Sequence, residues 1–229
     1  MSHTLDLTSD DGTLFSAYVA EPATPPRGAV VVLQEIFGVN AHIRHVADGY
    51  ADAGYLAVAP STFHRVQAGV DLGYADADRV KGAALKAVVE ALPAPGVLPD
   101  VQAAIDHAAR VSGGRVAVVG FCWGGLLAWR AACLLQGLAA AVPYYGGGMT
   151  AEVERVRQPR CPVLAHFADQ DTWIPLDGVR AFQAAQPGVE VQIYGAHHGF
   201  NCDQRTAWHA PSAELALERT LAFLARHVG

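Results

Sequence analysis

The sequence lacks the features that mark membrane, secreted or nucleic-acid-binding proteins. No stretch of about 18 uncharged apolar residues occurs, so we predict no membrane-spanning helix. There is no basic run and no alternation of basic and aromatic residues, and the formal charge is −6, so we expect no nucleic-acid partner. The start, MSHTLDLTSDDG, lacks the basic and apolar regions of a signal peptide. We therefore predict a cytoplasmic protein.

Cysteine is also scarce, and its spacing is uninformative about metals. The chain has four cysteines without CxxC or CxxH spacing, at Cys122, Cys133, Cys161 and Cys202. In a reducing compartment this pattern predicts free thiols, with no disulfide framework. A metal site is the weaker alternative. It would use His197 and His198 with Asp203, which lack the ligand spacing of a helical site. The spacing therefore favours no metal site.

What the chain does contain is typical of a compact globular protein. It has 229 residues, 52% of them hydrophobic and 17% charged. That length fits one α/β domain over residues 1–229, with a core large enough to need no disulfides. We see no internal repeat or low-complexity tract.

Strands and helices alternate along the predicted chain. The expected strands are short apolar runs, at Thr4–Leu7, Leu14–Ala20, Ala29–Leu33, Tyr55–Ala59, Val116–Val119, Leu138–Tyr145, Pro162–Phe167 and Val189–Tyr194. The expected helices run from an Asn40 cap to about Ala53, and over Ala77–Leu92, Asp100–Val111, Leu126–Ala132, Leu176–Ala185 and Ser212–His227. The first two strands form an antiparallel pair, and the others predict a mostly parallel sheet with helices on both faces. Residues Ser61–Asp76 look like a surface excursion of the kind that often covers a site.

The most informative stretch is Arg115–Trp129, RVAVVGFCWGGLLAW. It combines a buried strand, a glycine-bounded turn and the start of a helix. The turn has the form Gly-x-nucleophile-x-Gly, in which the nucleophile lies at the apex of a sharp strand-to-helix turn. Here that residue is Cys122. A buried structural cysteine is the alternative for the motif taken alone.

Two later strand ends carry the other groups that a nucleophilic cysteine needs. Asp169 and Asp171 follow one strand, and His197 and His198 follow the next. A thiol needs a base within hydrogen-bond reach, and the base needs an acceptor that fixes its tautomer. The order nucleophile, acid, histidine is that of α/β hydrolases. Each residue alone could be an ordinary turn or surface residue.

A fourth strand end adds Glu35, directly after Ala29–Leu33. Its carboxylate could reach the same sheet edge or be a solvated loop group. Hydrolases of this fold form the oxyanion hole from the N–H after the nucleophile and an N–H in the early strand-to-helix loop. Those two groups are the backbone N–H groups of Trp123 and Ile36.

Together these motifs resemble the dienelactone hydrolase (carboxymethylenebutenolidase) family of the α/β-hydrolase fold. The resemblance covers essentially the whole chain. It rests on QEIFGVN, GFCWGG, YYGGG, Asp171 before Pro175, HGF after His197, and ELALERTLAFL. It implies a Cys-Asp-His triad of Cys122, Asp171 and His198. It also implies that Glu35 holds the resting cysteine as a neutral thiol and takes its proton when substrate binds.

The implied reaction is hydrolysis of an unsaturated lactone that bears a carboxylate, dienelactone, to maleylacetate through an acyl-enzyme. The implied partner is a small lactone or ester, and we expect a monomer or a weak homo-oligomer. Candidate substrate-binding residues are Phe37, Arg79, Lys81, Cys202 and Arg205.

The sequence departs from the family pattern where the family binds the substrate carboxylate. The family arginine four residues after the histidine is Cys202 here, and Arg205 stands three residues further on. A thiol does not replace a bidentate guanidinium. Two alternatives therefore stay open. One is a broader esterase or thioesterase with an uncharged substrate, and the other is a non-catalytic ligand-binding member of the fold.

Overall fold

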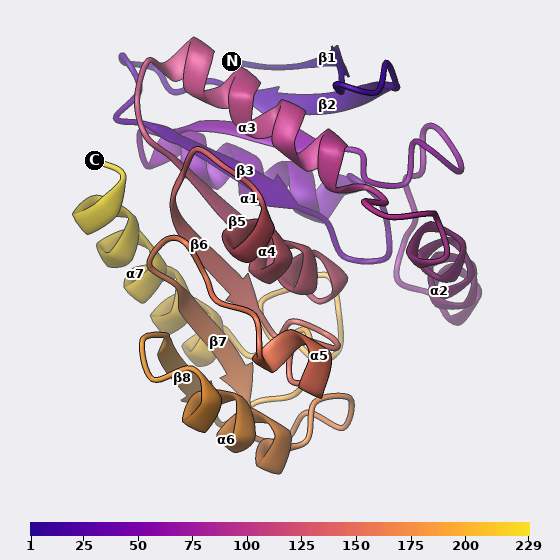
Figure 1. The fold of residues 1–229 in the computed structure, drawn as a ribbon, viewed down its shortest axis with the longest axis vertical. Helices are drawn as coiled ribbons and strands as arrows, with labels where there is room; N and C mark the ends of the chain where they lie inside the picture. The colour runs from indigo at the N-terminus through magenta and orange to yellow at the C-terminus, as the bar shows by residue number, and fades with distance from the viewer.

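A computed structural model describes all residues from 1 to 229, and it contains one eight-stranded sheet (Figure 1). The strand order is β1-β2-β4-β3-β5-β6-β7-β8. Strands β1 and β2 are antiparallel to each other, β2 is antiparallel to β4, and the other neighbours are parallel. This is the mostly parallel sheet with an N-terminal antiparallel pair that the alternating pattern predicts, and it agrees with the α/β-hydrolase fold that the resemblance implies.

The strands are β1 (Ser2–Thr8), β2 (Leu14–Ala20), β3 (Ala29–Leu33), β4 (Leu56–Pro60), β5 (Val116–Phe121), β6 (Leu138–Tyr144), β7 (Leu164–Ala168) and β8 (Glu190–Tyr194). The helices are α1 (Ala41–Asp52), α2 (Asp76–Glu90), α3 (Leu98–Ser112), α4 (Trp123–Leu134), α5 (Glu152–Arg155), α6 (Leu176–Ala185) and α7 (Ala210–His227). Each expected element is present, with ends shifted by a few residues. The one-turn helix α5 was not predicted, because four residues carry no helical periodicity.

Helices cover both faces of the sheet, as the uninterrupted apolar strands predict. Helices α3 and α4 lie on one face, and α1 and α7 lie on the other (Figure 1). Every residue of β3, β4, β5 and β7 is buried. Strands enclosed on both faces have no polar side to present, which explains why these runs do not alternate.

Local signals at the element ends are also confirmed. The Asn40 side-chain oxygen accepts a hydrogen bond from the Ile43 N–H at 3.2 Å and so caps helix α1. Helix α2 lies apart from the main layers, next to the loop that follows β3 (Figure 1). None of the helices combines the length and the apolar character needed to cross a bilayer.

Candidate active site

Cys122 occupies the strained turn between β5 and α4. Its φ of 55° and ψ of −115° lie outside the regions that an L-residue prefers. The surrounding glycines allow the backbone to pack tightly: a Cβ on Gly120 would meet the carbonyl oxygen of Gly124, and one on Gly125 would lie 2.6 Å from that of Tyr144. The strain is therefore imposed by close contacts on both sides of the turn.

Asp171 and His198 form the hydrogen-bonded pair that a nucleophilic cysteine requires. His198 Nδ1–H donates to Asp171 Oδ2 at 2.7 Å. The other carboxylate oxygen, Oδ1, accepts the backbone N–H groups of Trp173 at 2.8 Å and Ile174 at 3.0 Å. These bonds fix the carboxylate and the tautomer of the imidazole, and they leave Nε2 as the base.

The electrostatics of His198 couple it to Cys122. Burial lowers the pKa of the imidazole, but the charge of Cys122 and the hydrogen bonds with Asp171 and Cys122 outweigh it and raise the pKa to about 10. His198 and Cys122 therefore interact directly, through a hydrogen bond and through charge. The neighbouring His197 instead pairs with the Gln170 carbonyl at 3.0 Å and is exposed.

Glu35 is fully buried beside this pair, and two side chains hold it. Arg205 Nη1 donates to Oε1 at 3.0 Å, and the Tyr74 hydroxyl donates to Oε2 at 3.2 Å. No hydrogen bond joins Glu35 to Cys122. In this structure the carboxylate is therefore bound to a cation and a phenol, which differs from the resting contact with the thiol that the resemblance implied.

Arg205 reaches the site although the family arginine position is Cys202. The Arg205 guanidinium lies 5.9 Å from the ring centre of Phe37 and 6.0 Å from that of Tyr74. Gly199, with φ of 83°, passes so close to it that a Cβ there would meet Nη1. Arg205 thus places a guanidinium next to Glu35, although it stands three residues after the position of the family arginine.

The other predicted substrate-binding residues separate into two groups. Phe37 packs on Tyr74 with ring centres 4.6 Å apart, next to Glu35. Arg79 and Lys81 are exposed on α2, where Arg79 pairs with Asp76 at 3.4 Å. Neither cation makes a hydrogen bond or ion pair with Glu35, Cys122 or His198, so the expectation that they line the site finds no support in the geometry.

Cys202 is fully buried next to Glu35 and Tyr74. Burial, together with the negative charge of Glu35, raises the pKa of its thiol to about 12. Such a thiol stays protonated near neutral pH. Cys202 therefore fills space under the site and carries no charge that could hold a carboxylate.

The backbone N–H groups of Ile36 and Trp123 donate none of the hydrogen bonds of the turns and loops. The first turn of α4 packs closely on the end of β3, where a Cβ on Gly124 would meet the Leu33 carbonyl. The bulky Trp123 side chain points away, stacks on Phe63 at 5.1 Å and donates its indole N–H to Glu90 at 2.8 Å. Its size therefore leaves the elbow undisturbed.

Three residues near the site were not predicted from the sequence. Tyr74 belongs to the excursion Ser61–Asp76, whose length was the available clue. Tyr145, also at positive φ (35°), packs its ring 5.1 Å from that of His198 and has a buried hydroxyl without a partner. His42 lies near Glu35 and Cys202, and these three are the metal-ligand types that come together here.

Comparison with known proteins identifies the family. A sequence model of the Dienelactone hydrolase family matches residues 15–228. The chain belongs to the dienelactone hydrolase family. Carboxymethylenebutenolidases of Pseudomonas putida and Pseudomonas knackmussii are each 35% identical over 228 residues, which cover 96% of this chain and 95% of theirs. A crystal structure from Klebsiella pneumoniae subsp. pneumoniae superimposes with a TM-score of 0.83 at 32% identity, covering 99% of this chain and 100% of the other.

Membership in the dienelactone hydrolase family confirms the fold class and the reaction class. The protein is a hydrolase of the dienelactone hydrolase type, and its substrates are small esters or lactones. The family match does not identify the residues that carry out the reaction.

Proposed function

We propose that the protein hydrolyses unsaturated lactones that bear a carboxylate, such as dienelactone, with Cys122, Asp171 and His198 as a catalytic triad. The observation that carries this proposal is the 2.7 Å bond between His198 and Asp171, next to a cysteine held at φ 55° on the strand-to-helix turn. No metal or organic cofactor takes part in the proposed reaction.

In the first half of the reaction the Cys122 thiolate attacks the lactone carbonyl carbon, and a C–S bond forms. The electron pair of the carbonyl moves onto its oxygen, where the unused N–H groups of Ile36 and Trp123 can stabilise it. When the tetrahedral intermediate collapses, the ring C–O bond breaks. The leaving oxygen is an enolate, which is stabilised by conjugation and takes up the proton that left the Cys122 thiol.

In the second half water hydrolyses the thioester. His198 Nε2 takes a proton from the water as it attacks the carbonyl carbon, and Asp171 stabilises the imidazolium that forms. The C–S bond then breaks, and the thiolate returns beside the imidazolium. The raised pKa of His198, about 10, supports this ion pair as the immediate product. Transfer of the proton from the imidazolium to the thiolate then restores the neutral thiol.

Glu35 and Arg205 support the choice of an anionic substrate. Arg205 is bound to Glu35 at 3.0 Å and lies among the rings of Phe37 and Tyr74. A substrate carboxylate would compete with Glu35 for the same guanidinium. Its binding would free Glu35, which could then accept the proton of a neutral Cys122 thiol and so couple thiolate formation to substrate binding.

Steady-state hydrolysis of cis- and trans-dienelactone, with p-nitrophenyl acetate alongside, tests the proposal in the wild type and in Cys122→Ala. We expect turnover of a dienelactone that disappears in Cys122→Ala. Ester turnover without lactone turnover in the wild type would reject the substrate and favour the broader esterase, for which Cys202 at the family arginine position is the specific argument. Unchanged activity in Cys122→Ala would reject the triad.

A further inference from the structure

A second set of reactive side chains lies under the site. Glu35, His42 and Cys202 each offer one ligand atom, and these atoms all lie within 4.8 Å of one another. All three residues are buried. They come from three separate segments, so the fold and not a local sequence motif brings them together.

Among these three residues, His42 has a buried ring nitrogen without a partner, which indicates that something can bind there. Its Nδ1–H donates to Asp203 Oδ1 at 3.1 Å, which leaves Nε2 as an unprotonated acceptor. Nε2 is buried and has no hydrogen-bond partner, and the side chain is only 2% exposed. A buried polar atom without a partner is costly, so a lone pair in this position is available to something that binds there.

We propose that Glu35, His42 and Cys202 form a binding site for a divalent ion of the zinc class. Thiolate, imidazole and carboxylate are the three ligand types that Zn²⁺ accepts, and three protein ligands leave a fourth place for water. Asp203 supplies the carboxylate that commonly orients a metal-bound histidine from its other nitrogen.

The charge and the distances are compatible with such an ion. Cys202 binds as the thiolate and its proton goes to the buffer, so two negative ligands balance the charge of the metal. Tetrahedral Zn–S and Zn–N bonds place their ligand atoms about 3.5 Å apart, so the side chains must approach by roughly 1 Å. One Glu35 oxygen can bind the metal while the other keeps Arg205, at the expense of the Tyr74 hydroxyl.

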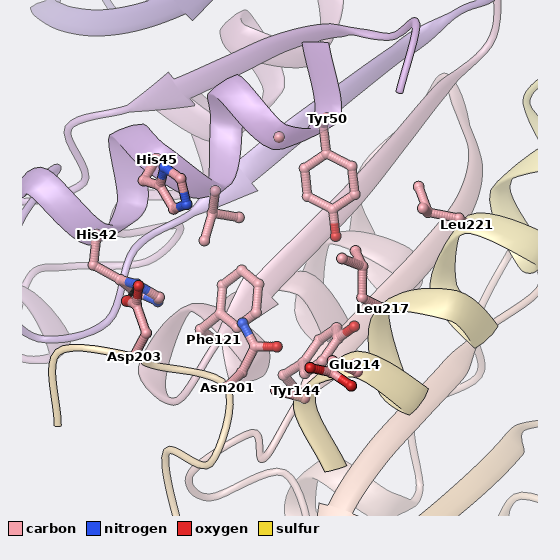
Figure 2. A pocket seen from close by; sticks show the side chains of 13 residues that line it. His42, His45, Tyr50, Phe121, Tyr144, Asn201, Asp203, Glu214, Leu217 and Leu221 are labelled. Carbon is pink, nitrogen blue, oxygen red and sulfur yellow. Dashed lines mark hydrogen bonds and ion pairs between the residues drawn. The ribbon is translucent and has the colours of Figure 1, made fainter. Parts of the chain in front are cut away.

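A cavity borders the outer side of this cluster, at His42. It has a volume of about 240 Å³ and lies between α1, α7 and the loop before α7 (Figure 2). In Figure 2 Asp203 lies against the His42 ring, with His45 further along the same helix. Asn201 and Glu214 add polar groups to its lining. Of the three proposed ligands only His42 lines this cavity, and Cys122 is not part of its lining.

The consequence for the reaction rests on the proposed function. A metal bound to Glu35 removes the carboxylate that would exchange its partner when substrate arrives. Zn²⁺ is then an inhibitor that acts without occupying the nucleophile, and a chelator restores the activity. Metal binding itself needs no such assumption and can be measured without turnover.

Co²⁺ is the probe for the binding test, because a thiolate ligand gives it an intense charge-transfer absorption that carboxylate and imidazole do not. The protein for the titration is Cys122→Ser, which removes the nucleophile as a competing thiol and keeps the proposed site. We expect one Co²⁺ per chain with the thiolate band. His42→Ala and Cys202→Ser in this background should weaken binding by more than about 100-fold, and Asp203→Asn by about 10- to 100-fold.

Two matched controls separate the site from its surroundings. His45→Ala lies on the same helix and in the same cavity, and Cys161→Ser removes another partly exposed thiol. Both should bind Co²⁺ as the parent does. Circular dichroism and thermal unfolding show whether each variant is folded, and Cys202→Ala with His42→Gln provide a second pair if the first is not.

Three results would overturn the proposal. A thiolate band that is present in the wild type and absent in Cys122→Ser would place the metal at the nucleophile. A band that survives in folded His42 and Cys202 variants would show an adventitious ion only. The absence of any thiolate band in both proteins would mean that the cluster binds no ion of this class, and the proposed hydrolase reaction would be untouched by that result.

Discussion

The molecule contains two Asp–His pairs, each with a cysteine nearby, and they differ in almost everything else. Asp171 and His198 are joined at 2.7 Å, and the aspartate is buried and bound by two backbone N–H groups. Asp203 and His42 are joined at 3.1 Å, and the aspartate side chain is 48% exposed. In the first pair the aspartate is the more deeply buried partner, and in the second pair the histidine is.

The two cysteines differ in the same way. Cys122 lies at the N-terminus of α4, partly exposed, beside two unused backbone N–H groups. Cys202 is fully buried and close to Glu35, and burial raises its thiol pKa to about 12. The same three residue types thus give the proposed nucleophile in one place and a protonated thiol in the other, because burial and the charge of Glu35 keep Cys202 neutral.

The two sites should differ most in how much kcat falls when the cysteine of each is replaced by alanine. Cys122→Ala should lower kcat by a factor on the order of 10⁶, as loss of a nucleophile does in other triads. Cys202→Ala should change kcat by less than about 10-fold, because this thiol only packs against Glu35 and Tyr74. Steady-state kinetics on one substrate measure both. Equal losses in the two variants would contradict the contrast between the sites.

The second largest difference should lie in how much kcat falls when the aspartate of each pair is replaced by asparagine. Asp171→Asn should lower kcat by about 10⁴-fold, because an amide no longer fixes the His198 tautomer or stabilises the imidazolium. Asp203→Asn should leave kcat within about 10-fold in metal-free buffer, because neither Asp203 nor His42 belongs to the proposed triad. The comparison is made with both proteins treated with chelator. A large loss in Asp203→Asn would give the second pair a role in catalysis.

Arg205→Met should separate anionic from neutral substrates. Loss of a charged hydrogen bond of about 2 to 3 kcal/mol should raise KM for a dienelactone by roughly 30- to 150-fold. Hydrolysis of p-nitrophenyl acetate should change much less, because this ester has no carboxylate. The ratio of kcat/KM for the two substrates is the measurement, and Arg79→Met is the matched control on an exposed arginine. Equal effects on both substrates would remove Arg205 from substrate recognition.

The smallest effect concerns stability against pH. The folded pKa of His198, about 10, lies above its ordinary value of 6.5. The stabilising contribution is therefore fully present below about pH 6.5 and is lost as the pH rises toward 10. Cys122→Ser removes the negative partner, so its stability should fall less over this range. Denaturant unfolding at pH 7 and pH 10 compares the two proteins. Parallel pH profiles would show that Cys122 does not raise the pKa of His198.

Local signals were enough to predict most of the fold. The fully apolar strands required a sheet covered on both faces, and Asn40 marked the start of α1 through its own side-chain bond. The placement of Cys122 followed from the glycines around it, because only such a turn needs them. The pairing of His198, rather than His197, with Asp171 came from the resemblance and agrees with the geometry.

Long-range packing could not be predicted in the same way. Arg205 reaches Glu35 from 170 positions later in the chain, and no spacing rule relates the two. Tyr74 reaches the same carboxylate from a loop without periodicity. The resemblance offered Arg79 and Lys81 only as loose counterparts of a second family arginine in the middle of the chain, and both are exposed on α2. Such contacts depend on how loops fold over the sheet edge.

The glycine contacts around Cys122 also bear on how this enzyme could be redesigned. Gly120, Gly124 and Gly125 each face backbone atoms so closely that any side chain would displace a strand or the helix. Libraries that vary these positions would consist mostly of misfolded proteins. Useful diversity lies instead in Ser61–Asp76 and in the segment between His198 and α7, which supply Tyr74 and Arg205 without shaping the turn. New substrate preferences should therefore be sought in those two segments, while the elbow stays constant.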